Sequence, residues 1–220
     1  MIKPPISLGC ICQWNMPFAI ALGHVATQPT AAPTFAAPGS ALPVKHLCLD
    51  FGSNGDRRDG DGNMWVHSGL PKEHALFLSY PITTEMYEKN DVASRTAFYT
   101  PIEDTNVPFV FATAQLGLKK CVLPITAKDG QGKGKFKVRL GFSGLPGELA
   151  GQRVFDVKLN GKTVLENFDA AKEAGKPDKA IWKEFVLDLD GDLTLELVAK
   201  SGADDLAKVP AIQAMEVIRQ

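Results

Sequence analysis

The sequence of 220 residues contains no long hydrophobic run: its longest apolar stretch, residues 16–22, is interrupted by Pro17. A helix that crosses a bilayer needs about 20 apolar residues, so we expect no membrane span. An excess of one charge is also absent, because 24 Lys and Arg stand against 25 Asp and Glu, a formal net charge of -1. A general attraction to nucleic acid or to anionic lipid is therefore not expected.

Cysteine is scarce. The chain has four: Cys10, Cys12, Cys48 and Cys121. They allow three pairings if all are oxidised, and their spacing does not select one. The Cys-x-Cys pair is not followed by a second pair at zinc-like spacing, and His24 and His46 are not spaced as ligands, so the sequence predicts no structural zinc. Cys48 and Cys121 are expected to be small buried residues in strands.

The composition also disfavours long helices, because 20 Gly and 15 Pro are distributed along the chain and each interrupts a helix. Residues 27–44 contain four prolines and no charge, a composition typical of extended linkers. We therefore expect an N-terminal extension and Pro/Ala-rich linker over residues 1–44 and one folded domain over residues 45–220. Lys3 precedes a mostly apolar stretch, but prolines and polar residues interrupt it, so it is a poor export signal.

The folded part is rich in short alternating segments bounded by turn residues, which predict strands. The Asn160-Gly161 turn between two alternating runs predicts a β-hairpin, and Asp190-Gly191 predicts a second one. Only residues 169–175 have a helical pattern. Strands are expected at residues 46–51, 109–114, 117–124, 135–142, 153–159, 162–165, 185–189, 193–197 and 212–218. The expected fold is an all-β sandwich of the jelly-roll kind with one short helix.

Residues 70–106 lack a clean period and are expected to form a long irregular excursion, with a strand near residues 96–99. Long ordered loops often carry function, and sugar sites place an aromatic face against the sugar beside polar side chains that bind its hydroxyls. The candidate carbohydrate site comprises Tyr80, Tyr87, Phe98 and Tyr99 with Asp56, Arg57 and Asn63. Tyr87 stands among charged and polar residues and is the aromatic expected to be exposed, whereas Phe98 and Tyr80 could instead pack beneath the loop.

Asp59, Asp61 and Asn63 alternate in a charged surface loop, as calcium ligands do. Met64 and Leu70 depart from the EF-hand pattern, since glycine and glutamate are needed there. Calcium is thus a candidate cofactor, and the alternative is a solvated turn in which Arg57 or Arg58 pairs with Asp56.

Enzyme motifs are absent. Gly161-Lys162-Thr163 resembles the end of a phosphate-binding loop, but Asp156 replaces the first glycine and the tripeptide lies in a hairpin. Ser143 lacks the second glycine of a nucleophile elbow. No pair of histidines has metal-enzyme spacing, and no Ser, His and Asp set is suggested locally. No catalysis is expected, although carboxylate pairs of glycosidases are set by the fold and leave no local signature.

Several spaced motifs occur in the order found in malectin and malectin-like domains. They are Gly151-Gln152-Arg153-Val154-Phe155-Asp156-Val157, Leu159-Asn160-Gly161, Val164-Leu165, Asn167-Phe168-Asp169, Glu173-Ala174-Gly175, and Pro210-Ala211-Ile212 with Met215-Glu216-Val217. Residues 47–218 therefore resemble this family. The resemblance implies a galactose-binding-like β-sandwich that recognises carbohydrate, an oligosaccharide or glycan, without catalysis. The tyrosine arrangement that grips a diglucoside in animal malectin has no residue-by-residue match here.

A narrower likeness involves Leu49-Asp50-Phe51-Gly52, Gly55-Asp56-Arg57-Arg58 and the upstream Cys-x-Cys pair. These residues are similar to the C-terminal region of large bacterial proteins in which a pyrroloquinoline-quinone-type repeat propeller precedes a malectin-like domain. The likeness implies a C-terminal module of a larger extracytoplasmic protein, periplasmic or secreted, where oxidised cysteines are plausible. It also implies the alternative function, a structural or protein-interaction module that packs against a β-propeller or another partner protein.

Overall fold

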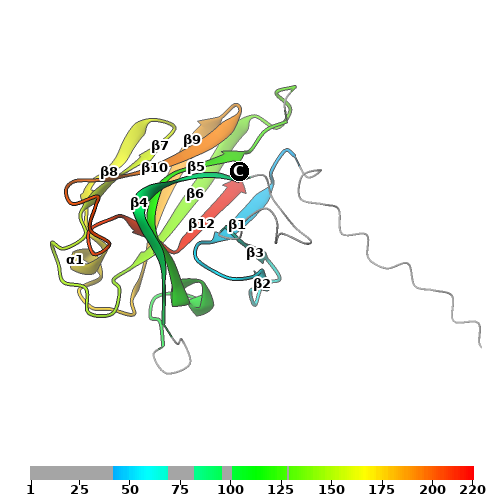
Figure 1. The fold of residues 1–220 in the computed structure, drawn as a ribbon. Helices are drawn as coiled ribbons and strands as arrows, with labels where there is room; N and C mark the ends of the chain where they lie inside the picture. The colour runs from blue at the N-terminus through cyan, green and yellow to red at the C-terminus, as the bar shows by residue number, and fades with distance from the viewer. Residues whose placement is uncertain (1–41, 69–81, 96–100, 128) are drawn as a thin grey trace, which may run out of the picture. The chain divides into compact units, whose positions relative to one another are not determined.

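Alternating apolar residues build two β-sheets whose inner faces pack together (Figure 1). The computed structural model describes residues 42–68, 82–95, 101–127 and 129–220, which all belong to the unit formed by residues 36–220. Val44, which the sequence assigns to the linker, is 4% exposed and its N–H donates to Ile125 O at 2.9 Å. The division into residues 1–44 and 45–220 stays a prediction.

The first sheet, sheet A, has six strands in the order β2-β3-β1-β12-β6-β9. β1 pairs antiparallel with β12 and parallel with β3. Their bounds are β1 His46–Asp50, β2 Arg57–Arg58, β3 Met64–His67, β6 Gly134–Ser143, β9 Ala180–Leu189 and β12 Ala214–Arg219.

The second sheet, sheet B, has the order β11-β5-β10-β7-β8, and β4 also pairs with β5. Its strands are β4 Thr83–Ser94, β5 Thr113–Pro124, β7 Phe155–Leu159, β8 Lys162–Phe168, β10 Asp192–Ala199 and β11 Ala211–Ile212. The described residues add one α-helix, α1 Ala170–Ala174, and the 3₁₀ helix η3 Pro108–Ala112. None of these helices is long and apolar enough to cross a membrane.

The core between the sheets is made of leucine, valine and phenylalanine side chains from both inner faces. Phe142 of sheet A contacts Phe155 and Phe168 of sheet B, with ring centroids 6.1 Å and 4.7 Å apart. A second buried cluster, which includes Cys48, Trp65 and Phe111, lies on the outer face of sheet A. The all-β sandwich with one short helix, predicted from the sequence, is confirmed.

The β7–β8 hairpin is confirmed, with Asn160 and Gly161 at positive φ of 47° and 76°. The second predicted hairpin is wrong: β9 pairs with β6 in sheet A, whereas β10 pairs with β5 and β7 in sheet B. The Asp190-Gly191 turn therefore carries the chain from one sheet to the other. Inner faces of a sandwich lie about 10 Å apart, which a short turn can span.

Two more predictions fail locally. Residues 109–114 form most of η3 instead of a strand, which begins only at Thr113. The excursion predicted as irregular contains the twelve-residue strand β4, whose pairing with β5 has register shifts at Glu85/Met86 and Met86/Asp91. These shifts explain why no clean two-residue period is visible in the sequence.

Besides its pairing with β5, one side chain and one close approach hold β4 to sheet B. The Tyr87 hydroxyl donates to Leu197 O at 3.0 Å and accepts from Ala199 N at 3.1 Å. Gly117 of β5 has φ of +74°, and a Cβ placed there would meet Lys89 O at 2.4 Å. Glycine is needed here for both its conformation and its lack of a side chain.

Replacing Gly117 by alanine should destabilise the domain by about 2 kcal/mol or more, because a left-handed conformation and a backbone clash are imposed together. The free energy of unfolding in urea measures this. Gly60→Ala is the matched control, since nothing lies within 4 Å of a Cβ at Gly60. Equal unfolding midpoints for the two variants would contradict the close approach of β4 to β5.

Replacing Tyr87 by phenylalanine should cost about 1–2 kcal/mol, because one hydroxyl satisfies a carbonyl and an amide of β10. Thermal or urea unfolding measures the loss. Thr84→Val removes an exposed hydroxyl from the same strand and should change stability by less than about 0.5 kcal/mol. A Tyr87→Phe variant as stable as Thr84→Val would show that the hydroxyl is not engaged.

Candidate functional site

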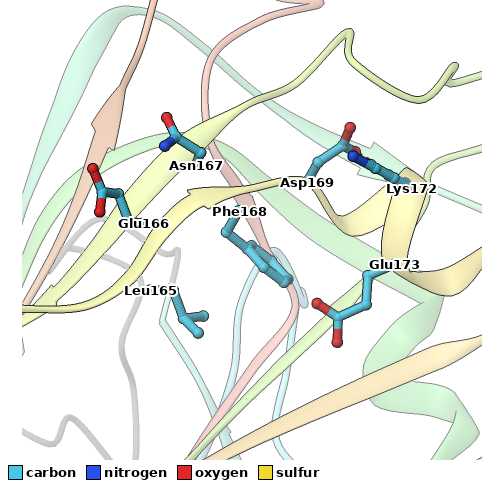
Figure 2. A pocket seen from close by; sticks show the side chains of 7 residues that line it. All are labelled: Leu165, Glu166, Asn167, Phe168, Asp169, Lys172 and Glu173. Carbon is cyan, nitrogen blue, oxygen red and sulfur yellow. The ribbon is translucent and has the colours of Figure 1, made fainter.

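A surface hollow of about 410 Å³ lies where β8 ends and α1 begins (Figure 2). Its lining residues are Leu165, Glu166, Asn167, Phe168, Asp169, Lys172 and Glu173. Seven residues that are almost consecutive thus form one depression, because the chain turns sharply from strand to helix. Asn167, with φ of +51°, makes this turn.

Asn167 is held in this conformation by its neighbour on β7. Its N–H donates to Asp156 Oδ1 at 2.8 Å, and Asp156 Oδ2 forms an ion pair with Lys200 at 2.6 Å. Desolvation acts to raise the pKa of Asp156, but the bonds from Lys200 and Asn167 outweigh it and lower the pKa. Asp156 is therefore a charged anchor for the turn.

Two carboxylates of the hollow are occupied by structural bonds. Asp169 caps α1, since Oδ1 accepts from Lys172 N at 3.0 Å, and its Oδ2 accepts from Gly151 N at 2.5 Å. Glu173 forms an ion pair with Lys183 of β9. Both groups shape the hollow; Asp169 is buried by these bonds, whereas the Glu173 side chain remains 40% exposed.

Three side chains around the hollow carry polar groups that could bind a ligand: Glu166, Asn167 and Lys172. They offer a carboxylate, an amide and an ammonium group beside the apolar Leu165 and Phe168. Such a set can accept from and donate to neighbouring hydroxyl groups. Phe168 is only 5% exposed, so its face is not open for stacking.

Arg95 joins loops at the end of the sandwich where β4 stops. Its Nε donates to Phe111 O at 2.9 Å, and its terminal nitrogens contact Ser143, Gly144 and Asp178. Because the Arg95 side chain is 8% exposed, these bonds are shielded from water. Arg95 therefore connects η3, the end of β6 and the loop before β9.

Asp50, in the quoted Leu49-Asp50-Phe51-Gly52 motif, is a buried carboxyl group with 1% exposure. Burial raises its pKa to about 7, although the hydrogen bond from Thr113, the charge of Arg57 and the hydrogen bond from Ser53 act in the opposite direction. Asp50 thus ends β1 as a buried carboxyl group to which Thr113 Oγ1 donates at 3.3 Å.

The predicted polar ligands Asp56, Arg57 and Asn63 lie together near β2 and β3, but each has a local contact. Asp56 pairs with His67 Nδ1 at 2.7 Å, which replaces the predicted pairing with Arg57 or Arg58. The Arg57 guanidinium lies over the Phe109 ring, 5.9 Å from its centroid.

The predicted calcium loop has a different geometry. Both carboxylate oxygens of Asp59 accept from N–H donors: the amides of Asp61 and Asn63, the Asn63 side chain and Trp65 Nε1, at 2.8–3.0 Å. Desolvation acts to raise the pKa of Asp59, but these hydrogen bonds outweigh it, and the pKa lies below its ordinary value. A carboxylate surrounded by N–H groups is a poor cation ligand, so Asp59, Asp61 and Asn63 form an Asp-centred turn.

Tyr87, which the sequence predicts to be exposed, is half-buried. Its ring packs beside Ala114, Leu116 and Val209, and its hydroxyl is bonded to β10. It belongs to sheet B, whereas Asp56, Arg57 and Asn63 lie at the β2–β3 edge of sheet A. Among the described residues, no hydrogen bond, ion pair or ring contact joins Tyr87 to those three.

The other predicted aromatics, Tyr80, Phe98 and Tyr99, lie outside the described residues. The hollow is not predicted from the sequence, where Asn167, Phe168 and Asp169 stand out only as part of the family resemblance. One signal could have found it: an asparagine between a strand and a capping aspartate marks a sharp turn. Cys48 and Cys121 are buried and in strands, as predicted, and both are free, which the sequence left open.

Solved structures with the same fold come from bacteria and plants. The β-glucuronidase 2 of Bacteroides uniformis, as a calcium-binding mutant, matches 82% of this chain and 19% of its own, with 15% identity and a TM-score of 0.59. The extracellular domain of ANXUR2 from Arabidopsis thaliana matches 79% and 48%, with 12% identity and a TM-score of 0.59. The plant receptor-like kinase FER matches 80% and 42%, with 19% identity and a TM-score of 0.54.

This chain spans less than half the length of each of these structures, and the low identities establish the fold alone. The predicted galactose-binding-like β-sandwich is confirmed by them. Comparison with curated proteins gives no match. The family model of the Malectin domain matches residues 78–212, which is more than half of the 220 residues and includes β4 to β11 with the hollow. The chain therefore belongs to the Malectin domain family.

Proposed function

We propose that this chain is a non-catalytic carbohydrate-binding module. The observation that carries the proposal is the match to the Malectin domain over residues 78–212, which agrees with the resemblance drawn from the sequence motifs. That resemblance implies recognition of an oligosaccharide or glycan without a chemical step. The chain is similar in fold to part of a β-glucuronidase, but it covers only 19% of that chain.

The hollow at the β8–α1 turn is the binding site that the described residues support best. Glu166, Asn167 and Lys172 surround it with acceptors and donors, while Asp169 and Glu173 are held by structural bonds. Sugar hydroxyls need acceptors and donors in alternation, which a carboxylate, an amide and an ammonium supply. Leu165 adds an apolar surface for the C–H groups of a ring.

The remaining predicted contacts stay proposals. Phe98 and Tyr99 follow Arg95 closely in the sequence and are proposed as stacking aromatics, together with Tyr80. Asp56, Arg57 and Asn63 would form a separate polar patch on sheet A. We also propose an extracytoplasmic location and an origin in a larger protein with a propeller; the extracellular domain of ANXUR2 has the same fold.

A second candidate function is docking of a protein partner, such as a β-propeller. The observation that favours docking is an exposed apolar residue: Val186 is 58% exposed on β9, the edge strand of sheet A. A similar fold also occurs in a complex of the plant peptide RALF23 with FER and LLG2.

A glycan array with the full chain, with and without calcium, tests the proposed function. We expect saturable binding to one glycan class that calcium leaves unchanged, since Asp59 is surrounded by N–H donors. The double variant Glu166→Gln/Lys172→Met should bind the best glycan about a hundredfold more weakly or worse, because it removes two charged hydrogen bonds that contribute about 1.5–3 kcal/mol each. Titration calorimetry measures this affinity.

The control is Glu88→Gln/Lys89→Met, which removes the same two charges from exposed positions on β4, outside the hollow. It should bind as the unchanged protein does. Equal affinities of the two double variants for the glycan would show that the binding site is not the hollow. A folded chain that binds no glycan on a broad array would overturn carbohydrate binding and favour the docking function.

A further inference from the structure

Three residues with metal-binding side chains meet on the outer face of sheet A. His46 and Cys48 are two positions apart on β1, so their side chains point to the same face. Glu216 of β12 is the direct cross-strand partner of Cys48. Figure 1 shows β1 beside β12. The antiparallel pairing thus joins residues that are 170 positions apart in the sequence.

The ligand atoms of these residues lie close together. His46 Nε2 is 2.7 Å from Glu216 Oε1 and 3.2 Å from Cys48 Sγ, and all three atoms lie within 4.8 Å of one another. In the described part of the chain, this is the one group of three such residues at that distance. A neutral imidazole, a thiolate and a carboxylate are each established ligands of zinc.

Zinc would fit after a small adjustment. Bonds of about 2.0–2.3 Å in tetrahedral geometry separate neighbouring ligand atoms by about 3.3–3.7 Å. The two separations from His46 Nε2, 2.7 and 3.2 Å, are shorter than these values by less than about 1 Å, and the third, between Cys48 Sγ and Glu216 Oε1, is within 4.8 Å. His46 can move, because its side chain is 33% exposed at the start of β1. The same opening admits water as a fourth ligand.

The surroundings hold the carboxylate in place and leave one oxygen for the cluster. Arg139 of β6 donates to Glu216 Oε2 at 2.6 Å, so Oε1 faces His46. Burial and the negative charges of Glu216 and Asp59 raise the pKa of the Cys48 thiol, while Arg139 lowers it. A divalent cation would reverse this balance, because it compensates the charges that keep the proton on sulfur.

We propose that His46 Nε2, Cys48 Sγ and Glu216 Oε1 bind one zinc ion. The Cys48 thiol releases its proton to solvent when the sulfur–zinc bond forms, and no oxidation state changes. The two negative ligands balance the charge of the ion. The site lies on sheet A, and its residues take no part in the hollow of sheet B.

Titration of the full chain with Zn²⁺ alone, under reducing conditions, tests the site. Cys10 and Cys12 could also take zinc, so the parent protein carries Cys10→Ser and Cys12→Ser. Calorimetry of this parent should give one zinc per chain. With Co²⁺, a near-ultraviolet thiolate-to-metal absorption band is expected.

Cys48→Ala and His46→Gln should each weaken zinc binding about tenfold or more, since loss of even an indirect partner of a metal costs about that much. The matched controls are Cys121→Ala, a buried free thiol in sheet B, and His67→Gln, which pairs with Asp56. Both controls should bind one zinc with unchanged affinity, and only Cys48→Ala among the cysteine variants should lose the cobalt band.

His46→Gln changes a part-exposed side chain, so this variant is expected to fold. It therefore still tests the site if Cys48→Ala does not fold. Circular dichroism verifies folding of each variant. A folded parent that binds no zinc, or unchanged affinity in His46→Gln, would overturn the proposal.

Discussion

Contact between the two sheets through three phenylalanine rings determines the geometry at the end of the sandwich that carries the hollow. Phe142 belongs to β6, whereas Phe155 and Phe168 belong to β7 and β8. Phe155 and Phe168 meet edge to face at 5.6 Å, and Phe142 packs on both. Such pairs contribute about 0.5–1.5 kcal/mol each beyond the area that they bury. They fix the place where β8 ends and so where the turn to α1 begins.

The helix that forms one side of the hollow could not exist without this support. A five-residue helix is far too short to be stable alone. Asp169 caps its first turn, Gly175 ends it at φ of +72°, and Ala170 and Ala174 pack into the core. Asp169 also holds Gly151, so one carboxylate connects the helix to the preceding loop. Its role in the hollow is therefore to position the neighbours that remain available.

The sequence predicts turns and buried positions better than it predicts which strands pair and which side chains meet. Asn160-Gly161 accepts two positive φ values, and the β7–β8 hairpin follows directly. Asp190-Gly191 carries a similar signal, yet a turn does not specify whether the next strand joins the same sheet, and β10 joins the other one. Tyr87 was misjudged for a related reason. Its charged neighbours indicate an exposed strand, but the acceptor for its hydroxyl lies 110 positions away.

Long-range strand pairing also explains why the His46, Cys48 and Glu216 cluster has no sequence signature. Zinc motifs are recognised by short spacings between ligands, whereas here the third ligand depends on the register of β1 and β12. A slip of one residue would turn Glu216 toward the core and bring Met215 or Val217 to the outer face. Those two side chains are fully buried between the sheets, so hydrophobic packing fixes the register. The same packing that stabilises the sandwich therefore assembles the cluster.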